Sequence, residues 1–289
     1  MKLSLQKQYE GTFTHSEQQQ EQISKIKPAS ISIIIPAYNE EMRIGKGLTR
    51  TISFCKIAEW DYEIIVAAEG SSDKTVEVIQ DKAEQIGQIM VLTGDKRLGK
   101  GGSIKNATRF ASKDYLAYMD VDLSADPSEF NRLLFHAQDC DIVIGSRILR
   151  GDLAPIKRPI SRAIFSHLYS ASFRLLFGTG IRDPQCGFKI FRREFAETLF
   201  KYVKTDGFAF DTEVVARAIR LGGRIKEVPI IWRHEIYSKI NIPQQVMLMG
   251  KDLLSIRYQL IREPQTTKPD LTFESLSMLK SKSNLLRLH

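Results

Sequence analysis

From Ile31 onward, short runs of apolar, β-branched residues alternate with longer segments in which apolar residues recur every three or four positions. The short runs predict buried strands, and the longer segments predict helices with one apolar face. The regular alternation indicates an α/β fold with a doubly wound, mostly parallel sheet and helices on both of its faces. The predicted strands cover residues 32–37, 63–68, 89–92, 115–119, 142–145 and 225–232.

The clearest helical face lies after the first strand, where Ile44, Leu48, Ile52 and Cys55 recur at spacings of four, four and three. The second half of the chain is less regular. There the pattern predicts a turn over 183–188, and it predicts helices over 208–221 and 246–260. The segment 159–177 is apolar on nearly every face, which suits either a membrane interface or a position in the core.

Composition along the chain suggests one domain between two arms. Residues 1–30 are polar and rich in Gln and predict a flexible N-terminal arm, 31–262 form the domain, and 263–289 predict a flexible tail. No run approaches the roughly 18 apolar residues of a spanning helix, and no signal-peptide pattern stands at the start. Three widely spaced cysteines suggest neither a disulfide framework nor a zinc motif. We expect a cytoplasmic protein, peripheral on the cytoplasmic face of a membrane.

The charge balance is basic, with 42 Lys and Arg against 34 Asp and Glu, a formal net charge of +8. That excess is compatible with a nucleic acid, an anionic membrane surface or a phosphorylated ligand. Binding to a nucleic acid would require a basic stripe interleaved with stacking aromatic residues, and the sequence shows none. We therefore expect no nucleic-acid partner.

The sharpest chemical feature is Asp120-Val121-Asp122, at the end of a predicted strand. Two carboxylates at this spacing can share a divalent cation with a diphosphate, and their hard oxygen atoms suit Mg²⁺ or Mn²⁺. Such a cation would stabilise charge on a departing diphosphate. The alternative is a merely polar strand end.

Basic residues supply candidate partners for phosphate groups. Lys100 stands in the glycine-rich segment 98–102 ahead of a predicted helix, where backbone N–H groups can cradle an anion, although a simple tight turn explains the glycines equally well. Arginine and lysine side chains suit phosphate oxygens, and solvated surface charge is the alternative for each. The further candidates are Arg147, Arg158, Arg162, Arg233 and Lys239.

Taken in order, several short motifs together resemble the family 2 glycosyltransferases, which have the GT-A fold. The resemblance runs from about residue 31 to residue 260 and is strongest to the dolichyl-phosphate β-glucosyltransferase and polyprenyl-phosphate sugar synthase branch. The motifs that carry it are 34–40, 70–73, 99–101, 120–122, 145–147, 180–189 and 249–254.

The resemblance implies a role for each matching residue. Pro36, Tyr38 and Glu40 would line the nucleotide pocket, while Asp120 and Asp122, with the backbone of Val121, would hold the metal and the diphosphate. Phosphates of donor or acceptor would be bound by Arg147, Arg233 and Lys239, and Arg158 and Arg162 fall where related enzymes place basic residues near the acceptor phosphate. The family usually has two acids before the Gly-Ser turn. Here Glu69 stands for the second, and Ala68, which replaces the first, cannot contact the nucleotide base as that acid would.

The implied activity is transfer of a sugar, glucose from UDP-glucose, onto dolichyl or polyprenyl phosphate with inversion at the anomeric carbon. A phosphate monoester is largely dianionic at neutral pH and is already a nucleophile, so this acceptor needs no general base. A lipid acceptor also implies a membrane surface as partner.

Other activities stay open. One is a polyprenyl-phosphate mannose synthase that uses GDP-mannose. Another is transfer to a saccharide hydroxyl, for which Asp211 or Glu213 would act as base. A third is a sugar-nucleotide binder without turnover, which Ala68 suggests.

Overall fold

The computed structural model describes residues 30–149, 160–207, 209–233 and 242–263, with the backbone alone for 160–165 and 242–249. Both predicted terminal arms therefore lie almost wholly outside the described residues. In chain order the elements are β1 (Ser30–Pro36), α3 (Ile44–Ile57), β2 (Asp61–Ala67), α4 (Thr75–Gln85), β3 (Ile89–Leu92), α5 (Gly99–Thr108), β4 (Tyr115–Tyr118), α6 (Glu129–Ala137), β5 (Ile142–Ser146), α7 (Ile160–Phe177), β6 (Lys189–Arg192), α8 (Arg193–Leu199), α9 (Phe210–Arg220), β7 (Ile225–Pro229) and α10 (Ile242–Arg262).

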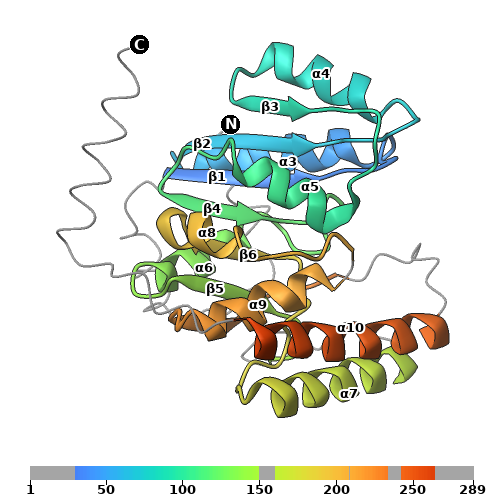
Figure 1. The fold of residues 1–289 in the computed structure, drawn as a ribbon. Helices are drawn as coiled ribbons and strands as arrows, with labels where there is room; N and C mark the ends of the chain where they lie inside the picture. The colour runs from blue at the N-terminus through green and yellow to red at the C-terminus, as the bar shows by residue number, and fades with distance from the viewer. Residues whose placement is uncertain (1–29, 150–159, 208, 234–241, 264–289) are drawn as a thin grey trace.

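These strands form one sheet in the order β3-β2-β1-β4-β6-β5-β7 (Figure 1). All neighbouring strands are parallel except at β6, which runs antiparallel to both β4 and β5. The prediction of a mostly parallel α/β sheet is confirmed. The pattern missed β6, because Lys189 and Arg192 flank only two apolar residues and hide a four-residue strand. It also did not predict α6 and α8.

The strand order creates a crevice between β1 and β4. The chain steps outward from β1 to β2 and β3, then returns through α5 to β4 on the other side of β1. Right-handed crossovers place α5 on the face of the sheet opposite α3 and α4. In sheets of this kind ligands bind beyond the carboxyl ends of the strands at which the direction reverses. The loops after β1 and β4 are therefore the first place to look for a site.

The core forms where the apolar pattern predicted it. Ile33, Ile34 and Ile35 of β1 are buried, and on α3 the predicted face of Ile44, Leu48, Ile52 and Cys55 packs against the sheet in the same core. At the predicted strand 225–232 only Ile225–Pro229 is regular, and Trp232 adds a single bridge to Ala125. That bridge ties the segment after β7 to the loop after β4.

Helices α7 and α10 lie side by side at one end of the molecule, away from β3 (Figure 1). The segment predicted as apolar all round forms α7. Phe173 on this helix is buried, whereas Leu168 and Leu175 are exposed. Only one face of the helix therefore packs into the core. In the part of the chain that the structure describes, no helix has the length and apolarity to cross a bilayer.

Candidate active site

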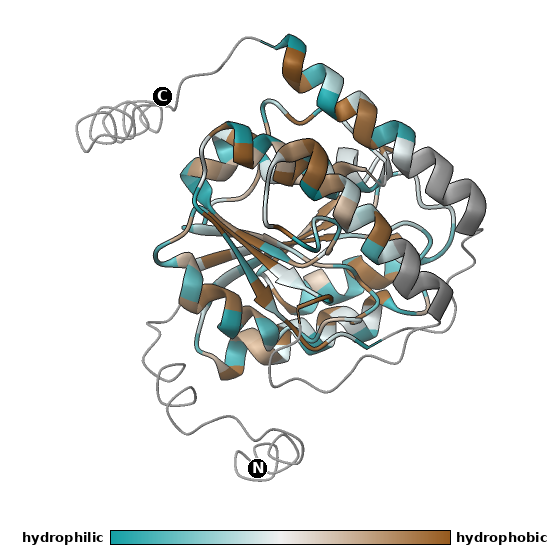
Figure 2. Cartoon of the chain, turned by 90° about the horizontal axis from the view of Figure 1, so that it is seen from below, coloured by the Kyte–Doolittle hydropathy of each residue, from teal (hydrophilic) through white to brown (hydrophobic). Residues whose placement is uncertain are grey.

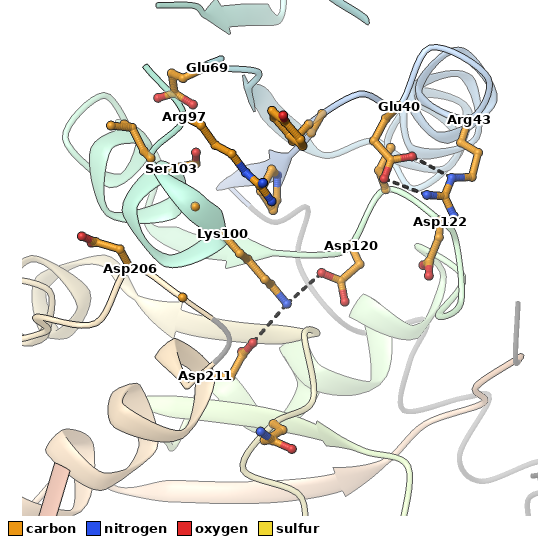
Figure 3. Close-up of a pocket in the computed structure, with 18 of the residues that line it drawn as sticks. Glu40, Arg43, Glu69, Arg97, Lys100, Ser103, Asp120, Asp122, Asp206 and Asp211 are labelled. Carbon is orange, nitrogen blue, oxygen red and sulfur yellow. Dashed lines mark hydrogen bonds and ion pairs between the residues drawn. The ribbon is translucent and has the colours of Figure 1, made fainter. Parts of the chain in front are cut away.

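A cavity of about 810 Å³ opens at the carboxyl ends of β1, β2 and β4 (Figure 3). The loops after these strands contribute Tyr38 and Glu40, then Glu69, then Asp120, Val121 and Asp122. The start of α5 contributes Lys100, and the start of α9 contributes Asp211. Residues far apart in the sequence thus meet at the crevice that the strand order predicts.

Lys100 joins two carboxylates at the floor of this cavity. Its Nζ lies 2.8 Å from Oδ1 of Asp120 and 3.0 Å from Oδ2 of Asp211. Burial alone would lower the pKa of Lys100, but the two carboxylates outweigh it and hold that pKa above its ordinary value. Burial also raises the pKa of Asp120, an effect that Lys100 only partly offsets. The ammonium group of Lys100 therefore stays charged and paired with these two acids.

Asp211 extends this network of ion pairs into the core of the protein. Its Oδ1 accepts hydrogen bonds from Nζ of Lys189 and from the hydroxyl of Tyr118, each at 2.7 Å. Lys189 is fully buried, and its Nζ also donates to the carbonyl of Cys186. Burial acts to raise the pKa of Asp211, but Lys100 and Lys189 hold it below the ordinary value. This network fixes the positions of Lys100 and, through it, of Asp120.

Hydrogen bonds within the turn that follows Asp122 fix the orientation of its carboxylate. The backbone N–H of Ser124 donates to Oδ1 at 2.9 Å, and the Ser124 hydroxyl donates to Oδ2 at 2.8 Å. Leu123, between them, has a φ of 56°, and Asn39 in the loop after β1 has a φ of 54°. Positive φ is uncommon outside glycine and is found preferentially at functional sites. These two residues lie in loops that line the cavity, whereas Glu59, the third non-glycine residue with positive φ in the described ranges, follows α3 and does not line it.

The carboxylates of Asp120 and Asp122 fit a divalent metal as part of its coordination shell. No group of three or more Asp, Glu, His or Cys in the described ranges is placed to hold an ion by itself. Each carboxylate nevertheless has oxygen lone pairs beyond the contacts given above, and hard oxygen donors suit Mg²⁺ or Mn²⁺. A diphosphate in the cavity would supply further oxygen ligands. The donor set is therefore that of a metal shared between protein and ligand.

Gly187 is required by the close approach of the chain to the Asp120–Lys100 pair. A Cβ at this position would lie 2.3 Å from Oδ2 of Asp120 and 2.7 Å from Nζ of Lys100. Both atoms end flexible side chains, so a methyl group would displace the ion pair and leave the fold intact. We expect Gly187→Ala to lower turnover by about 10²-fold, as a displacement near 1 Å does at a reacting centre.

The measurement is steady-state kinetics beside thermal unfolding, with Gly180→Ala as the matched control. A Cβ at Gly180 meets nothing within 4 Å, so that variant should keep full activity. Wild-type turnover in Gly187→Ala would show that the exact position of the pair is unimportant.

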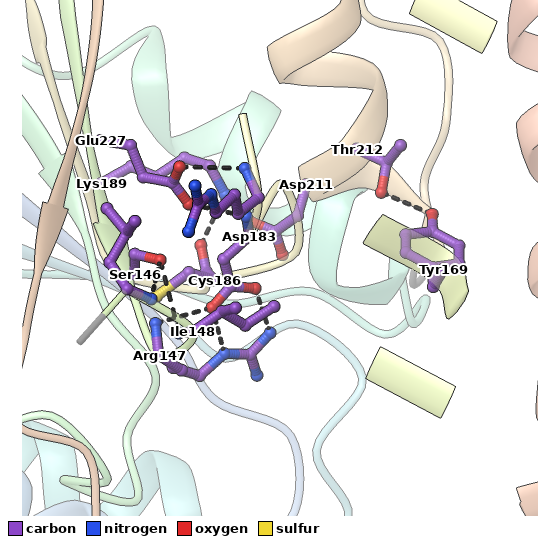
Figure 4. A network of polar contacts seen from close by, with 12 residues as sticks. Ser146, Arg147, Ile148, Tyr169, Asp183, Cys186, Lys189, Asp211, Thr212 and Glu227 are labelled. Atoms are coloured by element: carbon purple, nitrogen blue, oxygen red, sulfur yellow. Dashed lines mark hydrogen bonds and ion pairs between the residues drawn. The ribbon is translucent and has the colours of Figure 1, made fainter. Parts of the chain in front are cut away.

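Arg147 also lines the cavity and forms a bidentate pair with Asp183 (Figure 4). Its Nε and Nη2 donate to the two carboxylate oxygens at 2.8 and 2.7 Å, and its backbone N–H also donates to Asp183. Glu227 in turn accepts from the backbone N–H groups of Arg182 and Asp183. Burial acts to lower the pKa of Arg147, but Asp183 outweighs it and raises that pKa. The pair fixes the plane of the guanidinium group at the cavity wall.

Two further pairs of side chains line the cavity. Glu40 accepts two hydrogen bonds from Arg43, at 2.7 and 2.8 Å. The guanidinium carbon of Arg97 lies 3.9 Å from the centroid of the Tyr38 ring, a stacked cation–π contact. Arg97 thus covers one face of the Tyr38 ring.

The structure brings together most of the predicted site residues. Pro36, Tyr38, Glu40, Glu69, Lys100, Asp120, Val121, Asp122 and Arg147 all line the cavity. Arg233 does not: it is exposed, and its backbone N–H is bonded to the carbonyl of Ser124. Arg158 and Lys239 lie outside the described residues, as does the side chain of Arg162.

Two interpretations from the sequence need correction. At 98–102 the sequence suggested that backbone N–H groups bind an anion. One of these groups is already used within the protein, because the N–H of Gly101 donates to the carbonyl of Asp206 at 2.8 Å. Lys100 contributes instead through its ammonium group. Glu213, a candidate base, is fully buried and accepts from the backbone N–H groups of Lys204 and Thr205 and from Arg217. It is a structural anchor and does not line the cavity.

Sequence reasoning missed four lining residues with charged or amide side chains, Arg43, Arg97, Gln185 and Asp206, and also the hydroxyl of Ser103 on α5. Arg43 carries a local signal, since it follows Glu40 by three positions and pairs with it. Arg97, Gln185 and Asp206 enter the cavity from loops whose positions depend on contacts distant in sequence.

Comparison with known proteins shows which proteins this chain is similar to. The family model for glycosyl transferase family 2 matches residues 32–200. Glycosyltransferase AglD of Haloferax volcanii is 32% identical over 242 residues, which are 82% of this chain and only 38% of AglD. The dolichyl-phosphate beta-glucosyltransferase of Dictyostelium discoideum is 32% identical over 245 residues, 80% of this chain and 75% of that protein.

Solved structures show the same fold. Glucosyl-3-phosphoglycerate synthase from Mycobacterium tuberculosis, crystallised with Mn²⁺, UDP-glucose and phosphoglyceric acid, has a TM-score of 0.61 at 19% identity, with 80% of each chain covered. The α/β fold of this chain is therefore the fold of that solved structure. From the matched family model and the identity to these relatives, the chain belongs to glycosyl transferase family 2.

Proposed function

We propose that this chain transfers glucose from UDP-glucose to dolichyl phosphate, with inversion at the anomeric carbon. The observation that carries the proposal is the position of Asp120 and Asp122, which line one cavity at the carboxyl ends of β1 and β4. The name of the Dictyostelium relative, a dolichyl-phosphate beta-glucosyltransferase, supports the choice of acceptor and sugar.

Charge in the cavity suits the departure of a diphosphate. A bound Mg²⁺ or Mn²⁺, held by Asp120 and Asp122, would neutralise negative charge on the leaving diphosphate. Lys100 favours the ionised form of Asp120 and holds its side chain in place through their 2.8 Å contact. Arg147, fixed by Asp183, offers a planar cation for a phosphate of donor or acceptor. Catalysis then consists mainly of alignment and charge stabilisation.

The contacts of Asp211 favour a phosphate acceptor over a saccharide hydroxyl. A hydroxyl nucleophile needs a base within hydrogen-bond reach. Asp211 lines the cavity, but its carboxylate is occupied by Lys100, Lys189 and Tyr118. A phosphate monoester, with a second pKa of about 6, is already ionised near neutral pH and needs no such base.

A lipid-linked acceptor requires access to a membrane, and α7 and α10 offer a suitable surface (Figure 2). Leu254, Tyr258 and Ile261 recur at spacings of four and three along α10 and are 61%, 55% and 65% exposed. Leu168 and Leu175 recur at a spacing of seven on α7. Within 166–177 and 250–262, the exposed Lys and Arg have no exposed acid beside them; they are Arg174, Lys251, Arg257 and Arg262. We assign this α7–α10 surface to an anionic membrane, on the cytoplasmic face.

The membrane assignment predicts a specific loss on substitution. Leu254→Asp combined with Tyr258→Asp should weaken binding to vesicles that contain an anionic phospholipid by at least about tenfold, since two apolar side chains no longer enter the interface. Activity on a water-soluble, short-chain polyprenyl phosphate should stay unchanged. Ile57→Asp, at an exposed position on α3, is the control. Equal vesicle binding by all three proteins would disprove the assignment.

The proposed function is tested by offering purified protein each donor with each class of acceptor. With Mg²⁺ or Mn²⁺ and dolichyl phosphate, UDP-glucose should give a lipid-soluble labelled sugar, and GDP-mannose should not. Product from GDP-mannose would favour a mannose synthase, and product on a saccharide would favour a hydroxyl acceptor. Nucleotide binding without any product would indicate a binding protein.

A further inference from the structure

Glu263 stands directly after α10 and joins this helix to α9, which packs against it (Figure 1). Its carboxylate oxygens accept hydrogen bonds from Nη1 and Nη2 of Arg217 on α9, at 2.7 and 3.2 Å. Nζ of Lys204 donates to the same carboxylate at 2.7 Å. The hydrogen bonds from Arg217 lower the pKa of Glu263 to about 2, against the opposing effect of burial. Glu263 is therefore an ionised partner of Arg217 at neutral pH.

Arg217 connects Glu263 to a second acid, Glu213. Arg217 is only 2% exposed, and its Nε donates to Oε1 of Glu213, one turn earlier on α9, at 2.5 Å. Glu213 is fully buried. A buried cation is costly unless acids satisfy its donors, and here two acids share the guanidinium group. Loss of Glu263 would leave part of that group without an acceptor and disturb its contact with Glu213.

Glu213 holds the loop 204–207, which precedes α9. Its carboxylate accepts from the backbone N–H of Lys204 at 3.1 Å and from that of Thr205 at 2.7 Å. Residues 204–207 form neither helix nor strand, so the loop depends on such contacts for its conformation. Asp206 and Gly207 of this loop line the cavity. The ion network thus supports part of the cavity wall without lining it.

The same loop also fixes the start of α5 on both sides of Lys100. A Cβ at Gly99 would lie 2.6 Å from the carbonyl oxygen of Asp206, and one at Gly101 would lie 2.6 Å from that of Thr205. The N–H of Gly101 donates to the carbonyl of Asp206 at 2.8 Å. The position of the loop therefore sets the position of the backbone from which Lys100 reaches into the cavity.

We propose that Glu263 is a positioning residue for the cavity: acting through Arg217 and Glu213, it holds loop 204–207 against the start of α5. The inference rests on the proposed function in one respect, since it takes the cavity to be a nucleotide site. These three residues lie beyond residues 32–200, which the family model matches. The helix that ends at Glu263 thus supports the cavity as well as carrying exposed apolar residues.

Glu263→Ala tests the proposal by hydrogen–deuterium exchange and by titration with UDP in the presence of Mg²⁺. Leu253, Ile256 and Leu260 are buried and should keep α10 in place. The amides of Lys204 and Thr205 should exchange at least about tenfold faster, because their bonds to a charged acceptor are weakened. UDP should bind about tenfold more weakly, because binding then has to order the loop.

A purely structural role predicts a different result for Glu263→Ala. A lower melting temperature with unchanged exchange in peptide 201–207, or with unchanged UDP affinity, would overturn the proposal. Glu263→Gln keeps the length of the side chain and one acceptor oxygen, so it should fall between the wild type and Glu263→Ala in both measurements. Equal effects of Glu263→Gln on every peptide of the protein would also contradict a role confined to this loop.

Glu197→Ala is the matched control. Glu197 is an exposed acid on α8 that pairs with Arg193 at 3.3 Å and does not line the cavity. Its replacement also takes an acid from an arginine, but it should change neither the exchange of the loop amides nor the affinity for UDP. A change as large as that in Glu263→Ala would show that the effect is not specific to Glu263.

The order of the contacts is tested in a variant that lacks Arg217. In Arg217→Met, the further change Glu263→Ala should cause little additional loss of UDP affinity, since Glu263 acts through Arg217. A further loss of about tenfold would show that Glu263 acts on the cavity by another route and would contradict the proposal.

The two possible failures are distinguishable. If the wild-type protein does not bind UDP, the proposed function fails, and the exchange of the loop amides still decides whether Glu263 holds the loop. If the wild type binds UDP and Glu263→Ala matches it in both measurements, the cavity is a nucleotide site and only the role of Glu263 is wrong.

Discussion

Asp122→Asn is expected to lower the rate of sugar transfer by at least about 10³-fold, with the fold retained. The amide keeps the size of the side chain and an oxygen for the Ser124 contacts, but it removes a negative charge from the cavity. A neutral amide is a weaker ligand for Mg²⁺ or Mn²⁺, so less charge on the departing diphosphate is neutralised. The measurement is turnover across a Mn²⁺ titration, with circular dichroism to verify the fold.

Asp126→Asn is the matched control for this variant. Asp126 lies four positions along the same loop, pairs with Arg50 and does not line the cavity. Its replacement should leave the Mn²⁺ dependence of turnover unchanged. Wild-type activity in Asp122→Asn would remove this carboxylate from metal and diphosphate binding.

Asp211→Ala is expected to destabilise the protein by roughly 3–5 kcal/mol and to lower its activity. The substitution leaves the fully buried Lys189 without its 2.7 Å carboxylate partner and removes one of the two acids that hold Lys100. An uncompensated buried charge is among the most destabilising changes that one substitution can make. Chemical denaturation measures the free energy of unfolding.

Two further variants serve as comparisons for the stability of Asp211→Ala. Adding Lys189→Met to Asp211→Ala removes the stranded charge and should restore most of the lost stability, but not the activity, because the Lys100 contact stays broken. Asp61→Ala removes the exposed partner of Lys113 and should change stability by no more than about 1 kcal/mol. A loss in Asp211→Ala as small as that in Asp61→Ala would show that the buried network does not hold the site together.

Much of the fold and of the cavity lining could be predicted because the signals are local. Apolar runs mark β1, β2, β3, β4 and β5, and the polar residues that follow several of them fall where parallel strands end together. Asp120 and Asp122 could therefore be assigned to a site from their place after a predicted strand, and the resemblance to the family added Tyr38 and Glu69.

The rest depends on contacts between distant positions. The partner of Arg147 is Asp183, 36 positions later, and it occupies donors that the sequence suggested for phosphate. Gly187 meets Asp120 and Lys100 only once the short antiparallel β6 is in place. Glu213 resembles a candidate base in sequence, yet in the fold it binds the backbone at Lys204 and Thr205. No local periodicity carries this information.

The most direct test of the central claim is the structure of the lipid product formed from UDP-glucose and dolichyl phosphate. Proton NMR of the purified lipid should show one glucose in the β configuration, inverted from the α linkage of the donor. A product in the α configuration, or no lipid-linked glucose at all, would contradict an inverting transfer to a phosphate nucleophile in this cavity.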